Sequence, residues 1–389
     1  MSDSFTEVTS QSWFSRLFES IKSVLFGGIL FLVAFPVLWW NEGRAVRTAR
    51  SLSEGLGAVV SVQADAVDPS KEGKLVHVSG AVKTAVPVAD DEFPVSSDGV
   101  KLIRTVEMYQ WTEQEKSESR KKVGGGTETV TTYNYQKEWK EGRVDSSGFR
   151  KSEGHENPEA PPYQSKTFTA DPVTVGAFTM SQEQVSKLTD SVDLPVDASA
   201  VKDKMQVKEG KFYMAEDPAS TNVGDVRVSY KVVKPAAVSL VAVQQASTFA
   251  PYQAKAGDAI LLVEAGTHTA AEMFKTAQER NAILTWILRA VGVFMMFLGL
   301  FMFFRPLVVL ADVLPLFGTL LSAGIGLFSF LVAAALSFIT IAIAWVFVRP
   351  VVGIGLLVVA FAGLFWLLKI GRGKKAARAA AAVPVPAVT

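Results

Sequence analysis

The stretch Ser23–Trp40, SVLFGGILFLVAFPVLWW, contains 18 consecutive residues without a charge and ends in two tryptophans. A helix needs about 20 mostly apolar residues to cross the roughly 30 Å core of a bilayer, and tryptophan favours the headgroup level. A cleaved secretory signal is the alternative, but Asn41–Arg44 does not form the small-residue cleavage site that such a signal needs. The stretch therefore predicts an uncleaved first membrane span at residues 23–40.

The residues before this span, 1–22, are interpreted as a tail that ends in an amphipathic segment. Within Trp13–Lys22, aromatic and aliphatic side chains recur at helical spacing opposite charged ones. Such a segment either lies in the membrane interface as a separate helix or simply begins the first span.

A second apolar block extends from about residue 283 to residue 368. Thr269 and Glu272 form a capping-box pattern, which predicts a helix at 269–304 that includes the second span. Arg289 lies near the start of its apolar part, so we favour an arginine that snorkels to the headgroups over a functional charge within the bilayer.

Arg305–Pro306 is expected to end that helix. The segment 305–319, which contains Asp312, is predicted to be interfacial or re-entrant, because the 36 uncharged residues between Asp312 and Arg349 are too many for one straight span. Two more spans follow at 320–347 and 350–368, and 369–389 is predicted to be a basic, disordered tail. An even number of spans, weighed with the excess of lysine and arginine on one side, predicts cytosolic termini and an extracytoplasmic domain at 41–268.

Between the first and second spans the pattern changes to the alternation of β-strands. Strands are expected at 74–82, 100–111, 130–139, 224–233, 238–243 and 259–264, and a capped helix at 181–190. The charged run at 112–122 and the glycines at 124–126 suggest a solvated hairpin tip. The predicted fold is therefore an α+β membrane protein with four transmembrane helices and a β-rich domain inserted after the first.

Composition and motifs point away from catalysis. The net charge of +1 gives no reason to expect nucleic-acid binding, and the absence of cysteine excludes thiolate chemistry and cysteine-ligated metals. The sequence contains none of the common nucleotide-binding, metalloprotease or serine-hydrolase motifs, and its three histidines lie in separate segments. We therefore expect no enzyme, no cofactor and no metal site. The candidates for a charge within the membrane are Arg289 and Asp312.

The segment Asn41–Gly57, NEGRAVRTARSLSEGLG, begins a series of motifs that includes EGKLVHVSGAV (72–82), VEMYQW (106–111), YNYQKEW (133–139) and GHENP (154–158). In these motifs the chain resembles the LUMA family, the transmembrane protein forty-three family, over about residues 20–370. The resemblance implies a four-span protein with a large luminal domain. Animal members self-associate at the inner nuclear membrane and organise envelope proteins, including emerin and lamins; for a bacterial chain only the scaffold role and topology would carry over.

Twelve residues of these motifs are the candidate family positions. Arg44, Arg47 and Arg50 share one face of a short helix, which could grip lipid phosphates or, as we favour, pair with Glu42, Glu54 and carboxylates of the domain. The full set is Asn41, Glu42, Gly43, Arg44, Arg47, Arg50, Glu107, Tyr109, Trp111, Trp139, His155 and Asn157.

These observations favour a non-enzymatic, multi-pass membrane scaffold that forms homo-oligomers and organises membrane proteins or lipids. The expected location is the endoplasmic reticulum or inner nuclear membrane in a eukaryote and the cytoplasmic membrane in a bacterium. One alternative is a channel or transporter component with a polar cavity at Arg289, Asp312 or the hydroxyl side chains of the third span. The other is an envelope-stress or signalling sensor whose hairpin tip, 112–128, binds a partner.

Overall fold

The computed structural model describes residues 3–197, 205–215, 220–351, 354–355 and 358, and it forms two compact units. The β unit comprises Met1–Gln11, Thr48–Lys121 and Thr127–Glu279. The helical unit comprises Ser12–Arg47, Lys122–Gly126 and the chain from Arg280 onward. The α+β class with a large β-rich region is thus confirmed, and each unit is described separately below.

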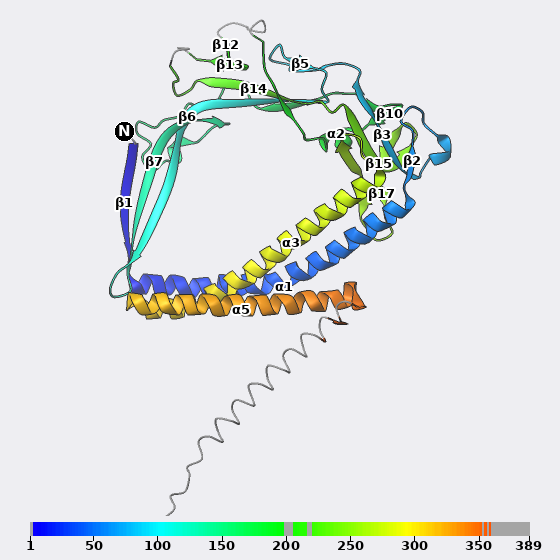
Figure 1. Ribbon diagram of the computed structural model, residues 1–389. Coiled ribbons are helices and arrows are strands. Elements are labelled where there is room, and N and C mark those ends of the chain that lie inside the picture. Colours follow the sequence, from blue (N-terminus) through cyan, green and yellow to red (C-terminus); the bar gives the residue numbers. More distant parts are fainter. Residues whose placement is uncertain (1–2, 198–204, 216–219, 352–353, 356–357, 359–389) are drawn as a thin grey trace, which may run out of the picture. The chain divides into compact units, whose positions relative to one another are not determined.

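Two sheets build the β unit (Figure 1). The larger one has the strand order β1 (Asp3–Gln11), β7 (Thr127–Glu141), β6 (Lys101–Lys121), β14 (Val226–Val233), β13 (Lys211–Met214) and β12 (Gln206–Lys208), with β11 (Val192–Leu194) on β14 and β8 (Lys166–Thr169) on β6. The second has the order β10 (Phe178–Met180), β9 (Val173–Val175), β3 (Leu75–Thr84), β15 (Ala237–Gln245) and β16 (Thr248–Ala250), with β19 (Leu262–Ala265) on β15 and β2 (Val60–Val62) on β3.

Smaller elements complete the unit. Ser181 and Gln184 form the reciprocal bonds of a capping box at the start of α2 (Gln182–Ser186), which lies inside the predicted 181–190 helix. The others are the strand pairs β4 (Val88–Ala89) with β5 (Ser96–Ser97) and β17 (Tyr252–Gln253) with β18 (Ala259–Ile260), and the 3-10 turns Pro69–Lys71 and Ser146–Gly148.

Side chains from both sheets share one apolar core. Alternate residues of β6 and β14, such as Val106 and Val228, are buried with Val78 of β3 and Leu240 of β15. This alternation is the period-2 pattern that predicts these strands from sequence, and burial of one face fixes their register.

The β6–β7 hairpin is longer than predicted. Residues 112–121 continue β6 instead of forming a solvated loop, and only residues 122–126 form the turn. Cross-strand hydroxyl pairs hold this polar half together, for example Ser117 Oγ with Thr131 Oγ1 at 2.9 Å and Ser119 Oγ with Thr129 Oγ1 at 2.7 Å. The charge run misled the prediction because both faces of the extension are polar.

The amino-terminal residues form a strand that the sequence analysis did not predict. β1 pairs with β7 at nine consecutive positions, from Asp3 opposite Tyr135 to Gln11 opposite Thr127, and Figure 1 shows it alongside the hairpin. Residues 3–11 of the predicted amino-terminal tail therefore belong to the larger sheet. The side of the membrane on which the termini lie stays a prediction.

In the part of the chain that the structure describes, three helices are long and apolar enough to cross a membrane: α1 (Trp13–Ala58), α3 (Ala270–Phe303) and α5 (Pro315–Val348). The helical unit contains α5 and the apolar parts of α1 and α3. The amphipathic segment before Ser23 and the arginine-rich segment after Trp40 are continuous parts of α1, not separate helices. A short helix, α4 (Arg305–Ala311), occupies the predicted break between the second and third spans. The predicted fourth span at 350–368 falls almost entirely outside the described residues.

Glycines allow α1 and α3 to pack closely. A Cβ added at Gly27 would lie 2.7 Å from Gly299 O, and one added at Gly299 would lie 2.6 Å from the backbone nitrogen of Phe31. Further along the same contact, a Cβ at Gly292 would lie 2.4 Å from Leu38 Cδ2. Small residues of this kind permit close backbone approach between membrane helices, where van der Waals packing drives association.

Candidate functional site: polar clusters within the helical unit

Polar side chains gather inside the helical unit on one face of α1 and one face of α3. Asn41 and Glu42 of α1 are 0 % and 1 % exposed, although they directly follow an apolar span. On α3, Asn281, Thr285 and Arg289 recur every four residues, which places them on one face of the helix. We call these residues, together with Arg44 and Trp345, the Glu42 cluster.

A bidentate ion pair is the centre of the Glu42 cluster. Arg289 Nε donates to Glu42 Oε1 at 2.7 Å, and Arg289 Nη2 donates to Glu42 Oε2 at 2.8 Å. The indole N–H of Trp345, on α5, donates to the same Oε2. One carboxylate therefore connects all three long helices, and its two oxygens accept three charge-assisted or indole hydrogen bonds.

Two tryptophans enclose the guanidinium of this pair. The Arg289 carbon Cζ lies 4.7 Å from the Trp286 ring centroid and 5.5 Å from that of Trp345. Cation–π contacts of this kind offset part of the desolvation of a buried arginine. Arg289 is thus held inside the unit by Glu42 and the aromatic rings, whereas the sequence favoured a side chain that reaches the headgroups.

The other half of the cluster is built from neutral groups and Arg44. Arg44 Nη1 donates to Asn281 Oδ1 at 2.9 Å and Arg44 Nη2 to Thr285 Oγ1 at 2.9 Å. Asn41 Nδ2 donates to the Thr285 carbonyl at 3.0 Å, and Asn281 Nδ2 returns a bond to the Ala45 carbonyl at 3.0 Å. α1 and α3 therefore exchange polar bonds in both directions along more than two helical turns.

A second polar cluster lies where α1 begins and α4 ends. Asp312 is fully buried and forms an ion pair with Arg16, 2.5 Å between Oδ2 and Nη2. Arg16 also donates to the Gly125 carbonyl, and Trp13 Nε1 donates to the Val309 carbonyl at 2.8 Å. Arg289 and Asp312, the two candidates for a charge within the membrane, therefore each form an ion pair within the helical unit.

The glycine at position 318 is required by this second cluster. A Cβ at Gly318 would lie 1.8 Å from Asp312 Oδ1, which no real contact permits. By contrast, a Cβ at Gly324, on the same helix, would meet no atom within 4 Å. The buried carboxylate and the start of α5 therefore need a residue without a side chain at position 318.

The family positions in the β unit are structural contacts of the hairpin. Asn157 clamps the backbone of β6, accepting from Trp111 N at 2.7 Å and donating to Trp111 O at 2.9 Å. His155, 1 % exposed, stacks on Tyr135 and bonds Asp3 Oδ2 through Nε2 at 2.9 Å. Burial, followed by the bond to Glu113, raises the pKa of Tyr135 to about 12, so that this hydroxyl stays a donor.

A row of outward side chains crosses the same sheet. Glu107 accepts two bonds from Arg227 at 2.6 and 2.9 Å, and this guanidinium lies 4.7 Å from the ring centroid of Trp139. Tyr109 packs on the other side of Trp139, with 5.3 Å between centroids. These family positions therefore stabilise strand pairing and do not converge on a cavity.

The three arginines after the first span are Arg44, Arg47 and Arg50. Arg44 belongs to the Glu42 cluster, and Arg47 and Arg50 also have interaction partners. The carboxylates expected to pair with the series have other partners: Glu42 binds Arg289, and Glu54 accepts from the Tyr252 hydroxyl at 2.9 Å. A Cβ added at Gly43 would meet no atom within 4 Å.

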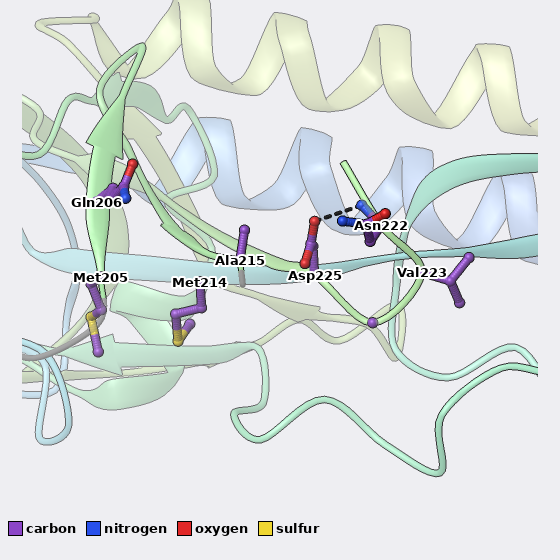
Figure 2. Close-up of a pocket in the computed structure, with 8 residues that line it drawn as sticks. Met205, Gln206, Met214, Ala215, Asn222, Val223 and Asp225 are labelled. Atoms are coloured by element: carbon purple, nitrogen blue, oxygen red, sulfur yellow. Dashed lines mark hydrogen bonds between the residues drawn. The ribbon is translucent and has the colours of Figure 1, made fainter. Parts of the chain in front are cut away.

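A wide hollow lies at the edge of the larger sheet (Figure 2). Its volume is about 810 Å³, and among the described residues that line it Asp225 alone is ionisable. In Figure 2 that carboxylate points to the backbone of its own loop, accepting from Asn222 N at 2.7 Å. The lining residues are Met205, Gln206, Met214, Ala215, Asn222, Val223, Gly224 and Asp225.

An acidic group at the β4–β5 turn could suit a cation by composition. Asp90, Asp91 and Glu92 lie close together, but Arg104 pairs with Asp90 at 2.7 Å and also with Glu92, and Lys166 pairs with Asp91. Each of the three carboxylates thus has a cationic partner, so the group is explained as an ion-pair network.

Sequence reasoning missed most members of the two polar clusters. The ion pairs join residues 247 and 296 positions apart, which no local pattern reveals. One signal was available: Asn281, Thr285 and Arg289 have a four-residue period at the start of an apolar helix. That period predicts a polar stripe, which in a membrane helix must face a protein partner.

Comparisons with known proteins agree with the family resemblance. The sequence model described as Transmembrane protein 43 matches residues 108–350. Mouse transmembrane protein 43 is 37% identical over 359 residues, covering 88% of this chain and 90% of its own. The human protein is 36% identical over 357 residues, covering 88% and 89%.

A more distant relative covers even more of the chain. The Drosophila melanogaster homolog of transmembrane protein 43 is 30% identical over 376 residues, which is 91% of this chain and 97% of its own. No solved structure matches significantly. The family match and these near full-length relatives show that the chain belongs to the transmembrane protein 43, or LUMA, family of integral membrane proteins.

Proposed function

We propose that this chain is a non-enzymatic membrane scaffold that self-associates and organises neighbouring membrane proteins or lipids. The observation that supports this proposal is that the Glu42 carboxylate joins α1, α3 and α5 through its bonds to Arg289 and Trp345. A buried pair with every oxygen bonded favours one fixed arrangement of helices. Such a rigid body suits a platform better than a protein that must alternate between conformations.

The outward faces of the helices support the same proposal. Large apolar side chains remain exposed along α1, such as Phe18 and Leu25, and along α5, such as Leu320 and Phe338. Gly28 of α1 and Gly324 of α5 have open space where a side chain would be, and small residues of this kind favour contacts between membrane helices. These surfaces are available to lipid and to other membrane helices.

The channel or transporter alternative loses its expected polar cavity. Arg289 and Asp312 each form an ion pair, with Glu42 and Arg16 respectively. Two of the α5 hydroxyls lie in helix contacts: Ser337 Oγ lies 3.6 Å from Met296 Sδ, and Thr340 donates to its own helix at Leu336 O. The hollow beside Arg289, about 430 Å³, is otherwise lined by apolar residues and Ser337 of α3 and α5.

The sensor alternative required a free hairpin tip. The turn at 122–126 belongs instead to the helical unit, where Gly124 N donates to Val313 O at 3.2 Å and Arg16 donates to Gly125 O. Gly124 and Gly125 have φ angles of +91° and +81°, a backbone that favours glycine. The turn is therefore held by contacts within the helical unit, although Val123 in it is 88% exposed.

We place the protein in an internal membrane such as the endoplasmic reticulum or inner nuclear membrane if the cell is eukaryotic, and in the cytoplasmic membrane if it is bacterial.

The experiment is extraction of the full chain from its membrane in a lipid-retaining polymer, followed by particle mass measurement and identification of co-purifying proteins. A scaffold should yield particles with two or more copies and a reproducible set of membrane partners or lipids. Strictly monomeric particles without partners would leave the proposal without support.

A further inference from the structure

The outer edge of β1 is an open strand edge on the β unit. Among the described residues, β7 is the only strand that pairs with β1, and β1 ends the order of the eight-stranded sheet. In an antiparallel pair, alternate residues direct their backbone N–H and C=O groups away from the partner. Alternate residues of the segment DSFTEVTSQ therefore present backbone donors and acceptors suited to another strand.

Natural edge strands normally carry features that prevent such pairing, and β1 lacks them. It contains no proline or lysine, and its register with β7 runs without a bulge. Its two acidic side chains are used within the chain: Asp3 bonds His155 at 2.9 Å, and Glu7 pairs with Arg150. The charge that would repel a second strand is thus largely neutralised.

The exposed side chains of β1 suit a strand partner. Phe5 is 38% and Val8 is 58% exposed, and the remaining positions are mostly serine and threonine. β-branched and aromatic residues on an open edge contribute cross-strand contacts when a partner is added.

We propose that β1 pairs antiparallel with β1 of a second copy of this chain, joining two eight-stranded sheets into one. This inference rests on the proposed self-association and names its interface. Ser12 alone separates β1 from α1, so every copy held in the membrane by this apolar helix brings its β1 into the same membrane surroundings as the β1 of other copies. Two identical strands paired antiparallel are related by a two-fold axis normal to their sheet, which makes the contact isologous.

The sequence of β1 selects the register of this pair. A two-fold axis normal to the sheet makes one residue face its own copy. Centring on Glu7 would oppose two carboxylates, and centring on Phe5 would place Asp3 opposite Glu7; both are unfavourable. Centring on Thr6 or Val8 avoids opposed acids, and Val8 also buries the most exposed apolar side chain of the strand.

The test uses the natural absence of cysteine. Single cysteines placed in turn at residues 4–10 of the full chain, in native membranes, are the only thiols present. Self-facing residues in antiparallel strands bring their Cβ atoms to about 4.5–5.5 Å, close enough for a disulfide after small adjustments. We expect one narrow maximum of disulfide-linked dimer, at Val8→Cys or Thr6→Cys.

Nitroxide labels at the same positions give an independent readout. Each step away from the centre separates equivalent sites by two residue rises, about 7 Å, so that the distances should form a V around the central residue. A flat profile, a maximum at Phe5 or Glu7, or crosslinks only to another segment would overturn the proposal.

An edge-blocking variant completes the experiment. Val8→Lys should abolish the β1 crosslinks, measured with Thr6→Cys, whereas the matched Val8→Thr variant should retain them, because lysine protects edges and threonine does not. Particle mass distinguishes the two proposals. Oligomers without β1 crosslinks refute this interface and leave the scaffold intact, whereas monomers refute both.

Discussion

Removal of one partner from the Glu42 cluster is expected to destabilise the helical unit strongly. Glu42→Gln leaves the Arg289 guanidinium without its countercharge at a site where Glu42 itself is 1 % exposed. Breaking a buried pair in this way typically costs about 3–5 kcal/mol, because the remaining charge is left desolvated. Unfolding of the purified chain in mixed detergent micelles, titrated with a denaturing detergent and followed by circular dichroism, measures this loss.

A double-mutant cycle tests the reason for the loss. Arg289→Met fills the same space with an apolar side chain, and the double variant Glu42→Gln/Arg289→Met should recover most of the stability. Glu19→Gln, the same change at an exposed position of α1, is the matched control and should leave the unfolding midpoint unchanged. Equal midpoints for Glu42→Gln and the control, or strictly additive losses in the double variant, would refute the reasoning.

Three further outcomes are expected. Gly318→Ala should lower the unfolding midpoint, because its Cβ meets the buried aspartate of the second polar cluster, whereas Gly324→Ala should not; equal midpoints would contradict the packing argument. Burial lowers the pKa of His77 below its ordinary 6.5, so the unfolded chain binds the proton first and stability should fall as pH drops below about 6.5; His77→Gln should weaken this dependence in a pH series of unfolding curves. If β1 pairs with β7 in the membrane-bound protein, Ser4→Cys and Ser147→Cys should react with a membrane-impermeant thiol reagent from the same side of sealed vesicles, and labelling from opposite sides would contradict that pairing.

The apolar spans and the buried strands could be predicted because burial imposes a period on their sequences. The alternation of Val226–Val233 reflects a strand with one face hidden from water. The unbroken apolar stretch Ser23–Trp40 reflects a helix with every face hidden from water. The capping boxes at Ser181 and Thr269 were equally readable, since both partners lie within four residues.

The elements that escaped prediction lack such a local signature. β1 is polar on both faces and is held by backbone bonds to β7, about 120 residues away along the chain. The outer half of β6 is likewise stabilised by cross-strand hydroxyl pairs rather than by an apolar face.

The candidate site illustrates the limit for membrane charges. Glu42 and Arg289 were each visible as charges beside apolar stretches, but their pairing depends on the crossing of α1 and α3 at Gly292 and Leu38. Each charge of the pair accounts for the presence of the other, so neither requires a separate functional role within the membrane.

Subunit counting in intact membranes tests the scaffold claim most directly. The full chain, carrying one fluorophore per copy and expressed at low density, is imaged in native membrane vesicles, and the bleaching steps of each spot are counted. A self-associating scaffold predicts spots with two or more steps at densities where chance overlap is negligible. Spots that bleach in a single step, at every density tested, would contradict it.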